Sequence, residues 1–256
     1  MKHLILTVLS VVIFLVLTTF CRKYDSYPQP TYTIAMATDT PPYSYAEAGP
    51  DDTLVQKGID YEALELIAAQ QNFKYRIVAD TWNNSYYALI AGKVDAFLSV
   101  VSATEDRKEI FDFYLYSEEE LAVATLLTRT DITSLEDLRN KIVVVMPNTV
   151  SYQYAMSLKN EYNLSVIEIS DYQQCYQSVI NGTVDAIIEE ETLLRVALRD
   201  YFPTIKISVK TGYTTPIGFA VQKGKNAPLL QMFGDGFQII KENKRWKSIR
   251  DKYLGD

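Results

Sequence analysis

The sequence is poor in the side chains that most metal sites and many catalytic centres require. It contains one histidine, His3, and two cysteines, Cys21 and Cys175, in 256 residues. Because His3 lies in an N-terminal segment that we expect to be removed, the mature chain has no histidine for acid or base catalysis. The same shortage excludes a cluster of histidine or cysteine metal ligands and a disulfide framework. We therefore expect no metal and no cofactor.

Positive charge is scarce as well. The chain has 25 Lys and Arg residues against 32 Asp and Glu residues, a formal charge of -7. Because binding to a phosphate backbone requires clustered basic side chains, this balance argues against a nucleic-acid partner. Apolar residues make up 48% of the chain, enough to bury a substantial core in two compact units.

The first residues carry the pattern of an exported protein. A short basic start precedes an unbroken apolar run at residues 4–17. This pattern predicts a signal peptide at residues 1–20 and then a linker at residues 21–31. An uncleaved anchor stays open as an alternative, because the apolar segment 4–20 lies at the lower limit of what spans a bilayer. We expect the chain in the periplasm or on the extracellular face of the membrane.

The two cysteines have different contexts. Cys21 resembles the lipid-modified cysteine of bacterial lipoproteins, but the residues LTTF before it depart from that pattern, since Phe20 stands where a small residue is typical. Lipidation of Cys21 therefore stays open as a second means of anchoring. Cys175 lies in DYQQCYQSVI, which predicts a helix, so we interpret it as a buried structural thiol and not as a nucleophile.

From Tyr32 onward, apolar residues recur with period 2 and period 3.6 in turn, which is typical of α/β units with largely parallel sheets. The first half predicts strands at 31–37, 74–78 and 94–100, with a helix that Asp60 caps and that ends near 71, and another at 85–91. The second half repeats this order after a short helix that Ser134 caps, with strands at 141–146, 165–170 and 184–188 and helices at 150–160 and 172–181. The tail predicts strands at 204–209 and 217–223 and helices at 228–241 and 244–253.

One local unit occurs twice, as LIAGKVDAF at residues 89–97 and VINGTVDAI at residues 179–187. We interpret the matching letters as structural, with Gly92 and Gly182 ending helices and the valines two positions later filling cores. Function should depend on the residues just after each copy, because ligands of open α/β sheets bind beyond the carboxyl ends of the strands.

Opposite charges come after the two copies. After the first lie Ser99, Ser102 and Arg107, a combination suited to a carboxylate, which a guanidinium can bind with two hydrogen bonds. After the second lie three glutamates at residues 189–191, which suit an ammonium group. The alternatives are a solvent-exposed Arg107 paired with a neighbouring acid, and a solvated acidic run. Taken together, the two edges predict a zwitterionic ligand, an α-amino acid.

Aromatic residues add a third element to this edge. Tyr43 lies in the loop TDTPPYSY after the first strand, and Trp82 lies in TWNNSYY after the strand at 74–78. Both come after carboxyl ends of strands, where they are able to stack on an aliphatic or cationic stem.

From Tyr32 to its end the chain resembles the family 3 bacterial extracellular solute-binding proteins, the amino-acid receptors of ATP-binding-cassette (ABC) importers. The matching segments are TDTPPYSY, KGIDYEALELIA, ALIAGKVDAFLSVVSATEDRKE, ITSLEDLRNKIVVVMPNT, VINGTVDAIIEE, PIGFAVQKG and KSIRDKYL, in this order. The resemblance implies an α/β fold of the two-lobe periplasmic-binding-protein type, with a ligand cleft between lobes that two crossover strands join. Lobe 1 is then formed by residues 32–119 and 213–256, and lobe 2 by residues 120–212.

The resemblance also implies a role for each candidate residue. By position, Arg107 and Ser102 bind the ligand carboxylate, Thr149 caps it from lobe 2, Trp82 and Tyr43 stack on the ligand, Ser99 lies near the amino group, and Glu190 binds the ammonium. Three features depart from the family pattern. Glu190 replaces the usual aspartate, Pro147 replaces a typical glycine, and the loop at 38–45 is about two residues short. The short loop removes a commonly aromatic position and leaves the placement of Asp39 open.

The resulting hypothesis is a monomeric binding protein without enzymatic activity that delivers an amino acid to an ABC-type permease. Asp39, if it reaches the pocket, favours a polar or basic ligand. Two alternatives stay open. One is a ligand-sensing domain that acts through a partner, and the other is an enzyme similar to cyclohexadienyl or arogenate dehydratase. The enzyme is disfavoured, because the position that holds its general acid falls near Leu193, which has no proton to donate.

Overall fold

The computed structural model describes residues 30–255. The predicted signal peptide, most of the linker and Cys21 therefore lie outside the described residues. The chain divides between Thr31 and Tyr32 into two units, and the second unit, which runs to Asp256, contains the whole α/β region. Among the described helices, none has the length and the apolar character that crossing a membrane requires.

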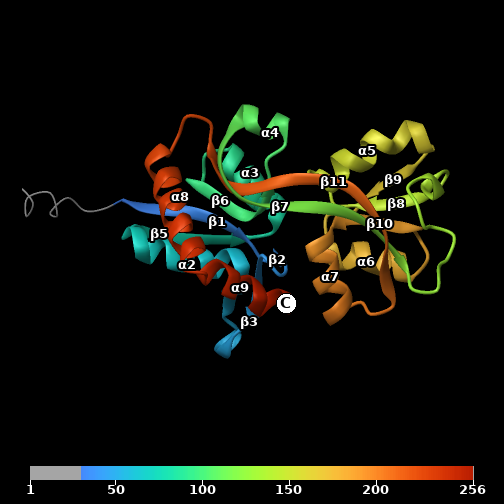
Figure 1. Cartoon of the computed structure of the whole chain (residues 1–256), viewed down its shortest axis with the longest axis horizontal. Coiled ribbons are helices and arrows are strands. Elements are labelled where there is room, and N and C mark those ends of the chain that lie inside the picture. Colours follow the sequence, from blue (N-terminus) through green and yellow to red (C-terminus); the bar gives the residue numbers. More distant parts are fainter. Residues whose placement is uncertain (1–29, 256) are drawn as a thin grey trace, which may run out of the picture. The chain divides into compact units, whose positions relative to one another are not determined.

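Strands and helices alternate along the chain (Figure 1). The strands are β1 (Thr31–Ala37), β2 (Asp39–Thr40), β3 (Ser44–Ala48), β4 (Leu54–Lys57), β5 (Lys74–Asp80), β6 (Ala96–Ser102), β7 (Phe111–Leu126), β8 (Ile142–Val145), β9 (Ser165–Glu168), β10 (Ala186–Glu190) and β11 (Ile205–Gln222). The α-helices are α2 (Ile59–Gln71), α3 (Trp82–Ile90), α4 (Glu105–Ile110), α5 (Val150–Tyr162), α6 (Tyr172–Ile180), α7 (Glu191–Asp200), α8 (Ala227–Glu242) and α9 (Arg245–Leu254). Two short 3-10 helices, η1 (Pro50–Asp52) and η2 (Glu136–Leu138), complete the set.

The main sheet confirms the predicted two-lobe fold. Its eight strands run in the order β5-β1-β6-β11-β7-β10-β8-β9. Counted from the two edges, the order β5-β1-β6 matches β9-β8-β10, and β1 pairs with β6 in parallel as β8 pairs with β10. The long strands β7 and β11 pair antiparallel between these groups and run side by side from one to the other (Figure 1). The lobe boundaries at 119/120 and 212/213 stay predictions, and we use them to name lobe 1 and lobe 2.

Three predicted details are wrong, and each has a local cause. The strands expected at 204–209 and 217–223 form the single strand β11, which carries an irregularity between Lys210 and Thr214. Asp60 does not cap α2, because Gly58 holds the cap position and the Asp60 side chain is buried. Ser134 does not cap η2, because the Asp137 carboxylate accepts hydrogen bonds from the backbone and hydroxyl of Ser134 instead.

The glycines and valines of the repeated unit have the structural roles expected of them. Gly92 and Gly182 lie just after helices α3 and α6 with φ angles of 66° and 69°, in the left-handed region that glycine adopts without strain. Val94 and Val184 are both buried and belong to the cores of lobe 1 and lobe 2, respectively.

The repeated aspartates also have a shared structural role. The Asp95 carboxylate accepts a hydrogen bond from the backbone N–H of Thr33 at 2.7 Å, and Asp185 accepts one from Ile142 at 2.7 Å. Each pair joins the start of one strand to the turn before its parallel neighbour. The matching letters therefore build the same sheet edge twice.

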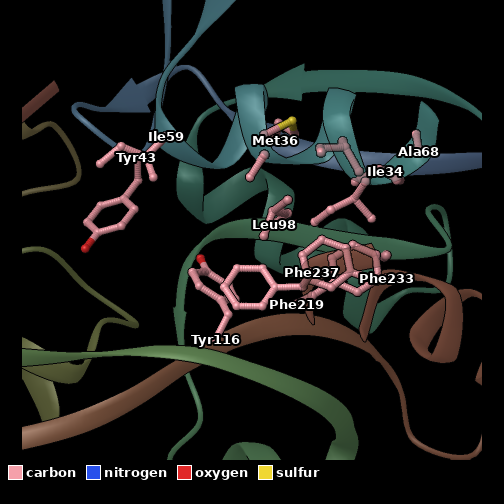
Figure 2. Close-up of a cluster of buried hydrophobic side chains, with 14 of the residues drawn as sticks. Ile34, Met36, Tyr43, Ile59, Ala68, Leu98, Tyr116, Phe219, Phe233 and Phe237 are labelled. Carbon is pink, nitrogen blue, oxygen red and sulfur yellow. The ribbon is translucent and has the colours of Figure 1, made fainter. Parts of the chain in front are cut away.

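A hydrophobic cluster that includes several aromatic rings forms the centre of lobe 1 (Figure 2). Phe219 of β11 stacks on Phe233 of α8 with ring centroids 4.1 Å apart, and Tyr116 of β7 packs against the same helix. Leu193 of α7 belongs to this cluster although it lies in lobe 2. The core of lobe 1 therefore includes a side chain from the other lobe.

Cys175 is a buried free cysteine in α6, as predicted. Its thiol donates a hydrogen bond to the carbonyl of Ile169 at 3.4 Å. Burial raises the pKa of Cys175 to about 12, so the thiol stays protonated at neutral pH.

Candidate functional site

Arg107 is held inside the protein by both lobes. It lies in the short helix α4, and its side chain is buried, with 2% of the residue exposed. Its Nη1 donates to the carbonyl of Ser102 at 2.8 Å, and its Nη2 donates to the carbonyl of Asn148 in lobe 2 at 2.6 Å. The guanidinium also faces the rings of Trp82 and Tyr86, at 5.3 Å and 5.2 Å from their centroids. The alternative of a solvent-exposed arginine is therefore wrong.

The charge of Arg107 lacks a directly bonded carboxylate. The salt bridges found within residues 30–255 do not include this side chain. Burial lowers the pKa of Arg107, while the nearby Tyr86 and Glu190 act in the opposite direction. A buried charge that is only partly compensated is costly, so a carboxylate placed here would be bound strongly.

Glu189 and Glu190 end strand β10 and are both buried, with 1% and 4% of each residue exposed. The Glu189 carboxylate accepts hydrogen bonds from the backbone N–H of Glu190 at 3.0 Å and from the Ser151 hydroxyl at 3.3 Å. Burial raises the pKa of Glu189 well above its ordinary value, and the charge of Glu190 raises it further. Two acids so close together favour a cation between or beside them.

Glu191, the third acid of the run, has a different environment. It begins helix α7 and forms salt bridges with Arg195 and Lys210. These partners hold the pKa of Glu191 below its ordinary value despite its burial. The alternative of a solvated acidic run is therefore wrong for Glu189 and Glu190, which are buried, and Glu191 is already neutralised.

The hydroxyl of Ser99 is engaged by the backbone. It accepts a hydrogen bond from the N–H of Ala37 at 2.8 Å and donates one to the carbonyl of Leu98. The carbonyl of Ser99 accepts a hydrogen bond from the indole of Trp82 at 3.0 Å. Ser99 thus joins β1, β6 and α3 at the carboxyl edge of the sheet, and its predicted role near a ligand amino group stays a prediction.

Ser102 ends β6 and Thr149 follows β8, and each forms hydrogen bonds through at least one of its polar groups. Ser102 is buried and supplies the carbonyl that binds Arg107. Thr149 is the N-cap of α5, where its hydroxyl accepts from the N–H of Tyr152 at 3.2 Å and donates to the carbonyl of Met146 at 2.7 Å. The cap places the N-terminus of α5 next to Asn148, which contacts Arg107.

The two candidate aromatics lie in different environments. Trp82 is buried and stacks on Tyr86 with centroids 5.4 Å apart, so its ring forms part of the wall around Arg107. Tyr43 belongs to the buried cluster of lobe 1 (Figure 2). Its hydroxyl donates a hydrogen bond to the carboxylate of Glu119. Its predicted stacking on a ligand stays a prediction.

Asp39 lies next to Trp82 and faces a cavity between the lobes. Its carboxylate accepts a hydrogen bond from the backbone N–H of Trp82 at 2.9 Å. Burial raises the pKa of Asp39 to about 6, and the charge of Asp171 from lobe 2 adds to this rise. The cavity has a volume of about 620 Å³, and Asp39, Asp171 and Tyr172 are among its lining residues. Its lining within the described residues contains no Lys or Arg.

The backbone at the end of β6 is strained, and a buried acid supports it. Val100 has a φ angle of 45°, which is rare for a β-branched residue. Its N–H donates to the Asp60 carboxylate at 3.0 Å, and the Tyr116 hydroxyl donates to both oxygens of Asp60 at 2.9 Å. Burial raises the pKa of Asp60 to about 7, although these hydrogen bonds lower it.

Three residues of this region escaped the sequence interpretation. Tyr86 faces Arg107, Asn148 supplies its carbonyl, and Tyr172 lines the cavity. Asn148 offered some indication in the sequence, because an asparagine that follows a proline after a strand readily adopts the left-handed φ of 63° found there. Tyr86 and Tyr172 offered none, since their positions depend on contacts between distant segments.

Comparisons with known proteins agree with this fold. Residues 32–256 match the protein family described as bacterial extracellular solute-binding proteins, family 3. A probable histidine-binding protein of Neisseria gonorrhoeae is 26% identical over 220 residues, which cover 82% of this chain and 81% of that protein.

Solved structures show the same architecture. An ancestral arginine-binding protein bound to arginine superposes with a TM-score of 0.78 at 25% identity, covering 89% of this chain and 100% of that one. The second substrate-binding domain of GlnP from Lactococcus lactis, in an open conformation, gives a TM-score of 0.60 at 28% identity, covering 90% and 98%. The sequence-based family assignment and fold class are thereby confirmed.

Proposed function

Because the chain belongs to the bacterial extracellular solute-binding proteins of family 3, we propose that its solute is an amino acid, which it passes to an ABC-type permease. The observation that carries this proposal is the pair of buried charges at equivalent strand ends. Among the residues that the structure describes, Arg107 in lobe 1 has no bonded carboxylate, and Glu190 in lobe 2 lies beside a second buried acid. A zwitterion supplies both missing partners at once.

Binding then proceeds by docking and closure. The ligand carboxylate meets Arg107 and Ser102 on lobe 1, and Thr149 and Glu190 of lobe 2 complete the site. Since the Arg107 guanidinium already contacts the Asn148 carbonyl, the same arginine senses both the ligand and the position of lobe 2. A ligand that binds the closed arrangement better than the open one shifts the population toward it.

A polar or basic side chain fits the surroundings of this site best. The cavity beside it is lined by carboxylates and tyrosines, and none of its described lining residues is basic. Asp39 and Asp171 face this space from opposite lobes, and repulsion from the Asp171 charge adds to the raised pKa of Asp39. A cationic side chain relieves that repulsion and has aromatic faces to pack on. Relatives whose names specify arginine or histidine support this choice.

We further propose that the protein binds without catalysing a reaction. Leu193, near which the dehydratase-like alternative would require an acid, is a buried apolar residue in the core of lobe 1. The chain is proposed to act as a monomer on the outer side of the cytoplasmic membrane. Anchoring through Cys21 or through an uncleaved N-terminal segment belongs to the same proposal.

The test is a thermal-shift screen of residues 22–256 against the twenty amino acids, related amines and arogenate. A ligand at about 100 times its Kd adds about 2.7 kcal/mol to the free energy of unfolding, so a true ligand raises the midpoint clearly. Matched pairs sharpen the result, because agmatine lacks only the carboxylate of arginine and cadaverine only that of lysine. We expect the amino acid of a pair to bind and the amine to fail. If no zwitterion raises the midpoint, the proposal is wrong.

A further inference from the structure

Tyr172 begins helix α6 at the junction of the two lobes. The Asp171 carboxylate caps this helix by accepting a hydrogen bond from the N–H of Gln174 at 2.8 Å. Side chains of a helix lean toward its N-terminus, so a residue in the first turn reaches beyond the end of its own helix. The cap therefore fixes the direction in which the Tyr172 ring projects.

The packing of Tyr172 differs from that of an ordinary core tyrosine. Its ring packs against the lobe 2 cluster that contains Cys175 and Leu194. It also packs against two clusters built mainly from lobe 1, one around Ile34 and the other around Trp82. A single side chain is thus in contact with the cores of both lobes.

Tyr172 lies near the proposed carboxylate-binding group. It packs against the cluster that contains Trp82, and the Trp82 ring faces the Arg107 guanidinium at 5.3 Å. Burial raises the pKa of Tyr172 well above its ordinary value, and the charges of Glu189, Glu190 and Asp39 raise it further.

The same residue also borders the cavity of about 620 Å³. Asp39, Tyr176 and Tyr201 line the same cavity. Neither Arg107 nor Glu190 is among the residues that line the cavity. Tyr172 thus lines the cavity and also packs against the cluster of Trp82, the residue that Arg107 faces.

We propose that Tyr172 is a specificity-determining residue whose ring forms the wall of a narrow passage between the head-group site of Arg107 and Glu190 and the cavity. The ring limits how far a ligand side chain extends into the cavity, because a longer or bulkier chain meets the ring first. Removal of the ring widens the passage and lets a longer side chain extend further toward Asp39. This inference rests on the proposed function, since it concerns the same amino-acid site.

The experiment measures affinity across two ligand series that differ by one methylene at each step. One runs from 2,3-diaminopropionate through lysine to homolysine, and the other from 2-aminobutyrate to 2-aminoheptanoate. We expect Tyr172→Ala to shift the preferred length upward and to change the affinity ratio of the longest to the shortest ligand by about tenfold. Tyr172→Phe keeps the ring and should keep the wild-type ranking.

The control is Tyr201→Ala, which removes another tyrosine that lines the same cavity but is 59% exposed. This variant should leave the ranking unchanged. Tyr172→Leu replaces Tyr172→Ala if circular dichroism shows that the alanine variant does not fold. An unchanged ranking in the folded small-residue variant overturns the wall proposal while the proposed function stands. A wild-type protein that binds no member of either series and no standard amino acid overturns both.

Discussion

Strands β6 and β10 each begin in a copy of the nine-residue unit, but their carboxyl ends lead into opposite charges. Up to this point the two copies agree, since Asp95 and Asp185 both accept a hydrogen bond from the neighbouring strand. They diverge in how the next helix begins. Two residues separate β6 from α4, which turns Arg107 inward, whereas α7 starts directly after Glu190. A duplicated framework thus presents two opposite charges through its connecting residues.

The largest expected effect comes from removing the charge after the first copy. We expect Arg107→Ala to weaken amino-acid binding by more than 100-fold, because a ligand carboxylate left buried without its partner costs about 3–5 kcal/mol. Isothermal titration calorimetry against the best ligand from the screen measures this loss. Arg107→Lys is the matched control, and we expect it to recover part of the affinity, since it keeps the charge but not the planar fork.

Arg107 also donates hydrogen bonds to Ser102 and Asn148. The thermal midpoint of each unliganded variant must therefore be measured beside its affinity. A folded Arg107→Ala protein whose ligand affinity is within threefold of the wild-type affinity would show that lobe 1 does not bind the ligand through Arg107.

The second prediction separates the two acids after the second copy. Glu190→Gln should weaken binding by about 10- to 100-fold, because it removes the charge proposed to bind the ammonium. Glu189→Gln should change the affinity by less than about threefold, since burial and the charge of Glu190 already favour the uncharged form of Glu189. Titration calorimetry at pH 7 compares the two. The reverse order would assign the ammonium to Glu189.

The third prediction tests the part of the unit that the two copies share. Asp95→Ala and Asp185→Ala should each lower the free energy of unfolding by about 1–3 kcal/mol, because each leaves a partly buried backbone N–H without its acceptor. Neither should alter ligand affinity more than about threefold, since neither aspartate lies at the carboxyl end of a strand. Urea denaturation and calorimetry give the two readouts. A large loss of affinity with unchanged stability would show that the matched residues act in binding.

The order of elements could be predicted because it depends on local periodicity. The strand TYTIAMA coincides with β1, and the repeated helix, glycine and strand appear in both lobes where expected. The error at Asp60 arose because its side chain binds distant partners instead of a local one. The Asp60 carboxylate accepts hydrogen bonds from Val100 and Tyr116, which are 40 and 56 residues away, and so does not cap its own helix.

The candidate site was predictable in its residue types but not in its contacts. The charges at Arg107 and Glu190 can be read directly from the sequence after each copy. Their burial cannot, since Arg107 is covered by Trp82, Tyr86 and an Asn148 carbonyl 41 residues away. Helix α7 was missed for a related reason. In the sequence, three consecutive glutamates resemble a solvated run, and only the structure shows that Lys210 and Arg195 neutralise one of them.

The smallest expected effect is a pH dependence that compares the buried acids of the two lobes. In lobe 1, burial raises the pKa of Asp39 to about 6 and of Asp60 to about 7. In lobe 2, burial raises the pKa of Glu189. An unfolded carboxyl titrates near pH 4, so the folded state binds more protons than the unfolded state between about pH 4 and 7. The stability of the unliganded protein should therefore fall as pH rises through this window.

Thermal midpoints at pH 5, 6, 7 and 8 without ligand measure this slope. The exposed Asp131 has a lowered pKa and titrates below the window, so it does not mask the trend. Asp60→Asn should flatten the slope between pH 5 and 7 if lobe 1 dominates, and Glu189→Gln should do so if lobe 2 dominates. A midpoint that rises from pH 5 to 8 would mean that the buried carboxyls ionise without cost. The charge at the end of β10 in lobe 2 would then depend on contacts other than the one between Glu189 and Glu190.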